Sequence, residues 1–362
     1  MRTLVKSLIT YSIIFSLLSC NSKEKTDFIT ISVDYDKDNN LSLSEISEKI
    51  DAIELEVTDE SLIQKISHVL YSPEIIIIQE SKSIMLFDKN GKFIRRIGSV
   101  GQGPGEFISI GSITADFESE KIFVYSDNGK FICYDFSGNV IKETPLGYYN
   151  RMYNPYMNFI DNKLLFLSES FITIEENLKN RRTLFFITED LLKTDSILIR
   201  NIDMSQLETG YAPQYDYITR DSNSTYIYYN VVVPNNIISD TLYHLSNNHL
   251  IPHLNIHFSK RGLNTDGRKE IYIDNIYRSS RYIFTLYSHS SRKQFYFFCH
   301  DVQTGESYNM KDGLSDDIHT NEKVIIRPLN NDANKFYYQH TNIKGDFLEE
   351  PNPTLYIGTL KK

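Results

Sequence analysis

The sequence predicts an all-β fold built from repeated antiparallel modules, and three observations support this class. Runs with period-two alternation or continuous apolar character dominate the chain, and turn residues separate them. Tyr and Phe are abundant, at 25 and 21 of 362 residues, which is usual for half-buried strands. Residues 75–97 align with residues 122–144 without a gap. Helical periodicity appears only near residues 44–50, so the crossover helices of a parallel α/β fold are missing.

Each copy of the repeat contains an apolar strand, a polar turn, a second strand, an Asp-x-x-Gly turn and a third strand. Gly91 of the first copy aligns with Gly138 of the second, where glycine supplies the positive φ of a tight turn. Looser copies occupy residues 163–199, 225–256 and 281–310. A repeat of roughly 40–50 residues with four short strands is typical of a propeller blade. Five internal units and one terminal unit therefore predict a six-bladed β-propeller with four-stranded antiparallel blades.

Such a ring needs a closure, which the two ends of the chain can provide. The segment "FITISVDY" at residues 28–35 reads as a strand, and the chain ends in the strand-like "TLYIGTLK". We expect residues 28–35 to pair with the C-terminal strands and complete the last blade, because closure hides edges that would otherwise invite aggregation. Residues 28–362 would then form a single domain.

The first 27 residues indicate export. Arg2 and Lys6 precede a short apolar run at residues 8–18, which suits a secretory signal and is too short to cross a bilayer as a helix. The run ends in "LLSC", which resembles a bacterial lipobox. The resemblance implies that residues 1–19 are removed, that Cys20 is acylated, and that residues 20–27 form a tether. The alternative is an ordinary cleaved signal with an incidental cysteine.

Charge and cysteine content narrow the possible partners. The net charge is −9, and removal of the signal with Arg2 and Lys6 makes it −11. This balance argues against a nucleic-acid partner, whose affinity depends on basic residues. No later stretch is long and apolar enough for a transmembrane helix. Cys133 and Cys299 lie in separate apolar runs, and we expect two buried thiols rather than a disulfide.

A glycine-rich stretch, "GQGPGEF" at residues 101–107, could be a phosphate loop or a turn between blades. A phosphate loop needs a helix N-terminus behind its glycines, and a Walker-type loop also needs Gly-Lys-Ser/Thr. Neither follows here, and proline removes a backbone N–H donor. We therefore predict a structural turn between the first two repeats, with the phenylalanine filling the core between blades. Its residues are Gly101, Gly103, Pro104, Gly105 and Phe107.

These segments also resemble a family. "FDKNGKFIRRIG" followed by "GQGPGEF", together with "SDTLYHL", "GLSDDIH" and the tail "NPTLYIGTLKK", is similar to the NHL-like six-bladed β-propeller lipoproteins of Bacteroidota. The likeness covers nearly the whole chain after the signal. It implies an exported, lipid-anchored propeller of the cell envelope, at the outer membrane. The resemblance does not assign the protein to the periplasmic or to the cell-surface side of that membrane. The family offers no catalytic motif to transfer, although some members are associated with glycan uptake.

Residues 34–45, "DYDKDNNLSLSE", have the oxygen-ligand spacing of an EF-hand calcium loop. Two features count against a calcium site: Asn39 replaces the usual glycine, and the preceding residues read as a strand instead of a helix. The alternative is a polar turn before a short helix capped by Ser44. The candidate calcium ligands are Asp34, Asp36, Asp38, Asn40 and Glu45.

An aromatic segment between the second and third repeats is a candidate ligand-binding surface, because tyrosine faces beside amides stack on sugars or peptide side chains. Packing in the core is the alternative for these residues. The complete lack of Trp weakens the case for a glycan. The candidate binding residues are Tyr148, Tyr149, Arg151, Tyr153 and Tyr156.

Three histidines, His249, His253 and His257, recur every fourth residue, but Pro252 and the alternating pattern predict a blade's outer strand. On a strand they would lie roughly 13 Å apart, too far to share one metal ion.

The sequence thus predicts a binding or scaffolding module for a glycan, a peptide or a partner protein, with the ligand at one end of the central channel. The alternative is a metal-dependent hydrolase or lyase, which needs Asp, Glu, Asn or His from several blades around one cation. Neither Gly-x-Ser-x-Gly nor His-Glu-x-x-His occurs in the chain, so no catalytic residue is assigned, and no cofactor other than calcium is suggested.

Overall fold

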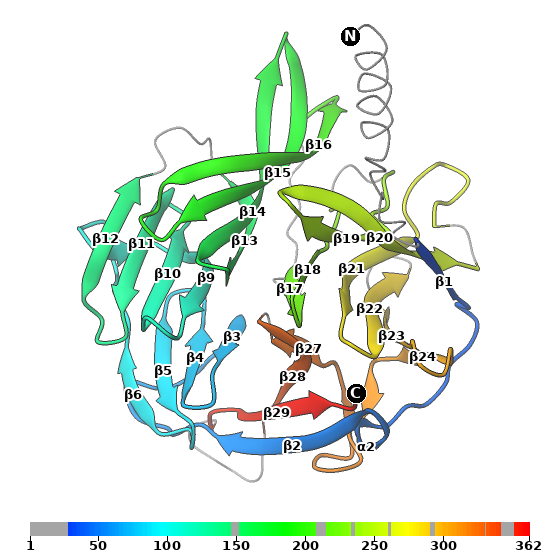
Figure 1. Ribbon diagram of the computed structural model, residues 1–362, viewed down its shortest axis with the longest axis horizontal. Coiled ribbons are helices and arrows are strands. Elements are labelled where there is room, and N and C mark those ends of the chain that lie inside the picture. Colours follow the sequence, from blue (N-terminus) through cyan, green and yellow to red (C-terminus); the bar gives the residue numbers. More distant parts are fainter. Residues whose placement is uncertain are drawn as a thin grey trace, which may run out of the picture.

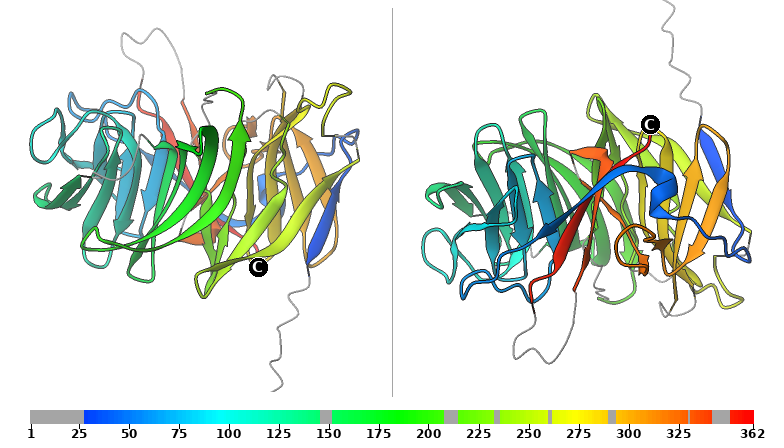
Figure 2. Two further views of the ribbon diagram at one scale, coloured as in Figure 1. Left: turned by 90° about the horizontal axis from the view of Figure 1, so that it is seen from above. Right: turned by 90° about the horizontal axis from the view of Figure 1, so that it is seen from below.

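The computed structural model describes residues 28–145, 152–207, 215–232, 236–259, 262–289, 294–329, 331–341 and 351–362. Six antiparallel sheets stand around a central axis and form a six-bladed β-propeller (Figure 1). Seen from the side, the ring is a thick disc whose strands run across its thickness (Figure 2). The predicted fold class is confirmed. In the described part of the chain, no helix has the length and hydropathy that a membrane span requires.

The first three blades follow one another in the chain, each with its strands in sequence order from the axis outward. Blade 1 contains β3 (His68–Tyr71), β4 (Ile75–Gln79), β5 (Ile84–Asp88) and β6 (Phe93–Arg96). Blade 2 contains β9 (Ile110–Asp116), β10 (Lys121–Ser126), β11 (Lys130–Asp135) and β12 (Val140–Pro145). Blade 3 contains β13 (Tyr153–Ile160), β14 (Lys163–Ile174), β15 (Asn177–Thr188) and β16 (Lys193–Met204). The β14–β15 hairpin is long and projects beyond the ring (Figure 1).

Of the other three blades, blades 4 and 6 each include a strand from the N-terminal part of the chain, and blade 5 is formed by consecutive strands. Blade 4 contains β17 (Ile218–Asp221), β18 (Ser224–Ile227), β19 (Thr241–Ser246) and β20 (His249–Phe258), with β1 (Ile29–Val33) added outside β20. Blade 5 contains β21 (Ile271–Arg278), β22 (Tyr282–His289), β23 (Gln294–Asp301) and β24 (Ser307–Lys311). Blade 6 contains β27 (Arg327–Leu329), β28 (Asp332–His340), β29 (Thr354–Leu360) and β2 (Ser47–Glu54).

Short elements connect the blades. A helical turn, α2 (Leu43–Ile46), precedes β2. A two-residue parallel pair links β7 (Ser99–Val100) and β8 (Glu106–Phe107), and an antiparallel pair links β25 (Leu314–Ser315) and β26 (Lys323–Val324).

The ring is closed by an N-terminal and a C-terminal strand, but the N-terminal strand is not the predicted one. β2 pairs antiparallel with β29 from Ser47 opposite Leu360 to Glu54 opposite Thr354 (Figure 1). The segment 28–35 was expected there and instead supplies β1, which runs parallel to β20. Ile31 and Val33 explain this placement, because both are buried in the cluster of blades 3 to 5. The helix expected near residues 44–50 is limited to the four residues of α2.

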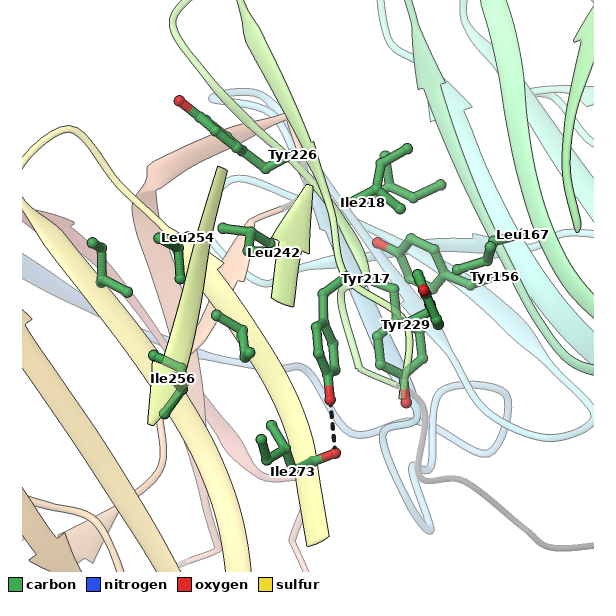
Figure 3. Packing of buried hydrophobic residues seen from close by; sticks show 14 of the residues in the cluster. Tyr156, Leu167, Tyr217, Ile218, Tyr226, Tyr229, Leu242, Leu254, Ile256 and Ile273 are labelled. Atoms are coloured by element: carbon green, nitrogen blue, oxygen red, sulfur yellow. Dashed lines mark hydrogen bonds between the residues drawn. The ribbon is translucent and has the colours of Figure 1, made fainter. Parts of the chain in front are cut away.

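Hydrophobic clusters fill the spaces between neighbouring blades, which explains the continuous apolar runs of the repeat. In β4, Ile76 and Ile78 pack toward blade 6, whereas Ile77 packs toward blade 2. Both faces of the strand are therefore buried, and an all-apolar sequence suits it. Figure 3 shows the largest cluster, where Leu167 of blade 3, Leu254 of blade 4 and Ile273 of blade 5 belong to one core.

The two clear copies of the repeat form the same turn. Gly91 and Gly138 have φ of 81° and 89°, and their N–H groups donate to the carbonyl oxygens of Asp88 and Asp135 at 3.0 Å. The aspartate side chains also accept hydrogen bonds from backbone N–H groups of their own turns. The structure thereby confirms the hairpin predicted from the Asp-x-x-Gly pattern.

Candidate functional site at the hub

Polar side chains meet at the axis of the ring, where the innermost strands begin. His68 opens β3 of blade 1, Arg327 opens β27 of blade 6, and Asp216 lies two residues before β17 of blade 4. His68 Nε2 lies 2.8 Å from Asp216 Oδ1, and Arg327 Nε lies 3.5 Å from Asp216 Oδ2. The hydroxyl of Tyr156, on β13 of blade 3, donates to Asp216 Oδ1 at 3.4 Å. Four blades thus contribute to one polar hub.

The hub is built around a buried negative charge. The side chains of His68 and Asp216 are only 4% and 1% exposed. Burial raises the pKa of Asp216, but the charges of Arg327 and His68, with hydrogen bonds from His68 and Tyr156, outweigh it and hold that pKa below its usual value. Because the ionised carboxylate can only accept, the His68 imidazole donates to it. Burial, with the charge of Asp216, raises the pKa of Tyr156 well above its usual value.

Arg327 is held in one orientation by three kinds of contact. Its guanidinium lies over the ring of Tyr215 at 5.5 Å from the centroid and over that of Tyr337 at 5.3 Å. Its Nη1 donates to the carbonyl of Ser67 at 3.1 Å. Burial lowers the pKa of Arg327, but the surrounding tyrosines and Asp216 outweigh this and keep the guanidinium charged. The result is a fixed cation at the axis.

A pocket of about 420 Å³ opens beside this arginine, between the hub, β28 and the β25–β26 pair. Its size is within the range of small-ligand sites. Its lining combines two cations, two carboxylates, a histidine, an amide and three tyrosine rings. The polar and aromatic lining residues are Tyr215, Asp312, Glu322, Lys323, Arg327, Tyr337, Tyr338, Gln339 and His340.

His68 and Asp216 have the composition of an acid–base pair, but neither lines the pocket. Both side chains are buried, and the pair contacts Arg327 through Asp216. Within the described ranges, no three His, Cys, Asp or Glu side chains gather where they could hold a metal ion.

The structure places only part of the predicted aromatic site. Tyr148, Tyr149 and Arg151 lie outside the described residues, as does the predicted lipidation site, Cys20. Tyr153 opens β13 and packs edge-on against Phe171 of the long hairpin, with ring centroids 5.2 Å apart. Tyr156 is buried and reaches the hub, where it contacts Asp216.

Four of the five predicted calcium ligands, Asp34, Asp38, Asn40 and Glu45, accept hydrogen bonds from protein donors. Asp34 Oδ1 accepts the N–H of Asp36 at 3.3 Å, and Asp38 Oδ1 accepts that of Lys311 at 3.2 Å. Asn40 Oδ1 accepts from Ser315 and Lys323 at 2.7 and 2.6 Å. Glu45 Oε2 accepts the N–H of Ser42 at 2.7 Å, so Ser42, not Ser44, stands at the N-cap of α2. Calcium binding stays a prediction, and it would require this loop to release these contacts.

The glycine-rich stretch connects blade 1 to blade 2. Gly101 N–H donates to the carbonyl of Phe107 at 3.0 Å, and Gly103 N–H donates to Glu106 Oε2 at 2.8 Å. Gly105, which follows Pro104, has a φ of 69° and donates to Glu143 Oε2 at 2.6 Å. Phe107 is buried in the cluster between blades 1 and 2.

Two other sequence predictions are confirmed. The three histidines lie on β20, which is the fourth strand of blade 4 counted from the axis, and only β1 lies outside it. Cys133 and Cys299 are buried free thiols on β11 and β23.

Comparisons with known proteins identify a matching family model and several similar structures. The model of a family described as a domain of unknown function, DUF4934, matches residues 26–356. The structure is similar to that of a Bacteroides fragilis protein whose name describes it as exported, with 14% identity, a TM-score of 0.59, and coverage of 92% of this chain and 100% of that one. It is also similar to BamB from Moraxella catarrhalis, with 12% identity, a TM-score of 0.40, and coverage of 77% and 70%. The Pan2 WD40 domain of Neurospora crassa gives 9% identity, a TM-score of 0.41, and coverage of 82% and 76%. No curated protein matches the chain.

Proposed function

The chain belongs to the DUF4934 family, and on this premise we propose that it is a lipid-anchored binding module of the cell envelope whose ligand occupies the hub pocket. The observation that carries the proposal is the fixed guanidinium of Arg327 at the wall of that pocket. A cation that is already ordered loses little conformational entropy when a ligand binds to it. A rigid ring that brings loops together at one end is a common setting for binding.

The lining of the pocket suits an uncharged or weakly charged polar ligand. Asp216 counters the charge of Arg327, and Asp312 and Glu322 counter that of Lys323, so the pocket has no excess positive charge for a polyanion. Tyr215 lines the pocket with a partly exposed ring, and Gln339 offers an exposed amide. A glycan or a peptide segment whose hydrogen-bond acceptors face Arg327 fits this combination.

Attachment to the envelope is the second part of the proposal. It is supported by the apolar signal and lipobox-like "LLSC" of residues 17–20, and by the similarity to an exported protein. Acylated Cys20 would anchor the propeller, and residues 21–27 would separate it from the lipid surface. We place the anchor in the outer membrane.

The binding role can be tested with the purified full-length chain on arrays of envelope glycans and of short peptides. Lys323→Ala and Gln339→Ala change the pocket wall without removing a buried group, and Lys92→Ala, on an exposed turn of blade 1, is the matched control. We expect saturable binding that falls about tenfold in the pocket variants, a loss of about 1.4 kcal/mol, and is unchanged in the control. Equal binding by all four proteins, or no binding to either array, would refute the proposal.

The anchor is tested separately by growing cells with an alkyne-labelled fatty acid. The wild-type chain should carry the label and remain with the membrane fraction, and Cys20→Ala should do neither. A labelled Cys20→Ala protein, or an unlabelled wild type, would remove the lipid anchor from the account.

A further inference from the structure

A second pocket lies on blade 1 and has a volume of about 630 Å³. Its walls are the segment that leads into β3, the turn that joins β4 to β5, and the end of β6. We call it the blade 1 pocket. Ser67 belongs to its lining, and the carbonyl oxygen of the same residue accepts a hydrogen bond from Arg327 of the hub pocket. The two pockets are therefore neighbours, although no described residue lines both.

Three cations line the blade 1 pocket, namely Lys65, Lys82 and Arg96, and all three side chains are exposed. In the part of the chain that the structure describes, none of them forms an ion pair with a carboxylate. Lys89 of the same blade, by contrast, pairs with Glu74 at 2.9 Å. The chain as a whole has a net charge of −9, so a pocket lined by unpaired cations differs from the average surface.

Among the described lining residues, Glu80 carries the one carboxylate, and both of its oxygens already accept protein donors. Oε1 accepts the N–H groups of Gln64 at 2.7 Å and of Lys65 at 3.0 Å. Oε2 accepts the hydroxyl of Ser83 at 2.6 Å. Glu80 therefore joins the turn between β4 and β5 to the segment that leads into β3. When its charge is counted, the lining keeps an excess of two positive charges.

Contacts to the backbone hold the same walls in place. The carbonyl oxygen of Ser81, in the turn between β4 and β5, accepts the N–H of Ile110 of blade 2 at 2.9 Å. Arg96 Nε donates to the carbonyl oxygen of Glu60, which orients the guanidinium. Ser67 and Ser81 add two further polar residues to the lining. A ligand therefore meets an ordered frame, and mainly the two lysine side chains lose conformational freedom when it binds.

We propose that the blade 1 pocket binds a phosphate monoester, whose phosphate group accepts hydrogen bonds from Lys65, Lys82 and Arg96. Such a group carries a charge of about −1.5 to −2 at neutral pH, which matches the positive excess of the lining. Lysine and arginine are common phosphate ligands, whereas a carboxylate or a sulfate ester has one charge and would leave the excess unbalanced. Leu62 and Val100 are exposed in the lining and offer apolar contacts to the carbon skeleton of the ester. This site does not depend on the proposed role of the hub pocket.

Calorimetric titration of the full-length chain tests the site and separates the sources of the phosphate group. Glucose 6-phosphate represents a sugar phosphate, glycerol 3-phosphate represents a lipid headgroup, and inorganic phosphate represents the free ion. Glucose and glycerol are the neutral counterparts of the two esters. We expect at least one ester to bind at least about tenfold more tightly than its neutral counterpart and more tightly than inorganic phosphate. Equal affinities within both pairs, no binding of either ester at millimolar concentration, or inorganic phosphate binding as tightly as both esters would overturn the proposal.

Variants of exposed side chains locate the site without disturbing the fold. Lys82→Gln and Arg96→Gln each remove one positive charge from the lining and should weaken the tighter ester about tenfold, with wild-type urea unfolding midpoints. Lys92→Ala, on an exposed turn of the same blade outside the pocket, is the matched control and should leave binding unchanged. Lys323→Ala, in the hub pocket, should also leave it unchanged. Wild-type affinity in Lys82→Gln and Arg96→Gln, or an equal loss in Lys92→Ala, would contradict the assignment.

Discussion

His68 and Asp216 meet at the hub with 2.8 Å between Nε2 and Oδ1, although 148 positions separate them in the chain. The contact joins blade 1 to blade 4, and Arg327 adds blade 6 through Asp216. A buried carboxylate is stable only when it is paired and hydrogen-bonded. The hub therefore acts as a polar clamp within a ring whose other contacts are mainly apolar.

Replacement of Asp216 by Asn should strongly destabilise the protein. The change leaves the partly buried Arg327 without its counter-charge and weakens the acceptor of the buried His68, and breaking a buried pair costs about 3–5 kcal/mol. Urea unfolding followed by circular dichroism measures the loss. Glu74→Gln, which breaks the exposed Glu74–Lys89 pair, is the control and should unfold at the wild-type urea concentration. A wild-type midpoint for Asp216→Asn would show that the hub charges do not hold the ring.

Stability should decrease as the pH falls through the range in which His253 titrates. Burial and the neighbouring charge of Arg278, with a smaller effect of His244, lower the pKa of His253 to about 4. Arg278 Nη1 donates to His253 Nε2 at 2.5 Å, so this nitrogen must stay unprotonated in the fold. The unfolded chain binds a proton near pH 6.5, and the folded chain does so only near pH 4. The free energy of unfolding therefore decreases as the pH falls from about 6.5 to about 4.

His253→Gln tests this contribution, because glutamine can still accept from Arg278 and does not titrate. The free energy of unfolding should decrease less steeply from pH 6.5 to pH 4 in the variant than in the wild type, as measured by urea titrations at several pH values. All other titrating groups are common to both proteins. Parallel pH profiles would mean that His253 is protonated normally in the folded state.

Two glycines at equivalent positions of the repeat should respond differently to alanine. Both have positive φ, which costs an L-residue about 1–2 kcal/mol. A Cβ on Gly138 would meet only ordinary contacts at 3.8 Å and beyond, whereas one on Gly91 would lie 2.1 Å from the carbonyl oxygen of Glu54, at the end of β2. Gly91→Ala should therefore cost about 1–3 kcal/mol more than Gly138→Ala. Equal losses of stability in the two variants would mean that the carbonyl group of Glu54 does not lie against Gly91.

The two cysteines of the propeller should be unreactive in the folded protein. Burial raises the pKa of the Cys133 thiol to about 11 and that of Cys299 to a still higher value. Few thiolates then exist at neutral pH, and the thiolate is the reactive form. In a Cys20→Ala background, Ellman's reagent should label neither thiol before urea is added and both afterwards. Rapid reaction of one thiol per native protein molecule would show that the strand carrying that cysteine opens.

The blades could be predicted from the sequence because the inner strands of the repeat are buried on both faces. Such strands are apolar at every position, as at Ile76 to Ile78. The sequence did not allow the closing strand to be identified. β2 lies at the outer edge of blade 6, and only Ser47 and Ile53 of its residues are buried, so its apolar pattern is weak. The more regular pattern of residues 28–35 was assigned to the closure instead.

The hub could not be predicted, because its residues are single polar side chains from four distant repeats. Asp216 and Arg327 stand in no local motif, and only closure of the ring brings them together. A weak signal existed: a polar residue stands at or just before the apolar inner strand in "SHVLY", "YDYIT" and "IIRPL". Of the predicted aromatic site, Tyr156 reaches the hub, but as a buried donor to Asp216.

The most direct test of the hub pocket is ¹⁹F NMR of the full-length chain labelled with 3-fluorotyrosine, titrated with the strongest ligand from the glycan and peptide arrays. Substitution to Phe assigns the signals of Tyr215, Tyr337 and Tyr338 at the pocket, and of Tyr229 and Tyr243, whose rings stack on each other in blade 4. We predict that the ligand shifts the pocket signals and leaves those of Tyr229 and Tyr243 unchanged. Shifts confined to Tyr229 and Tyr243, or absent from all five, would contradict a ligand site at the hub.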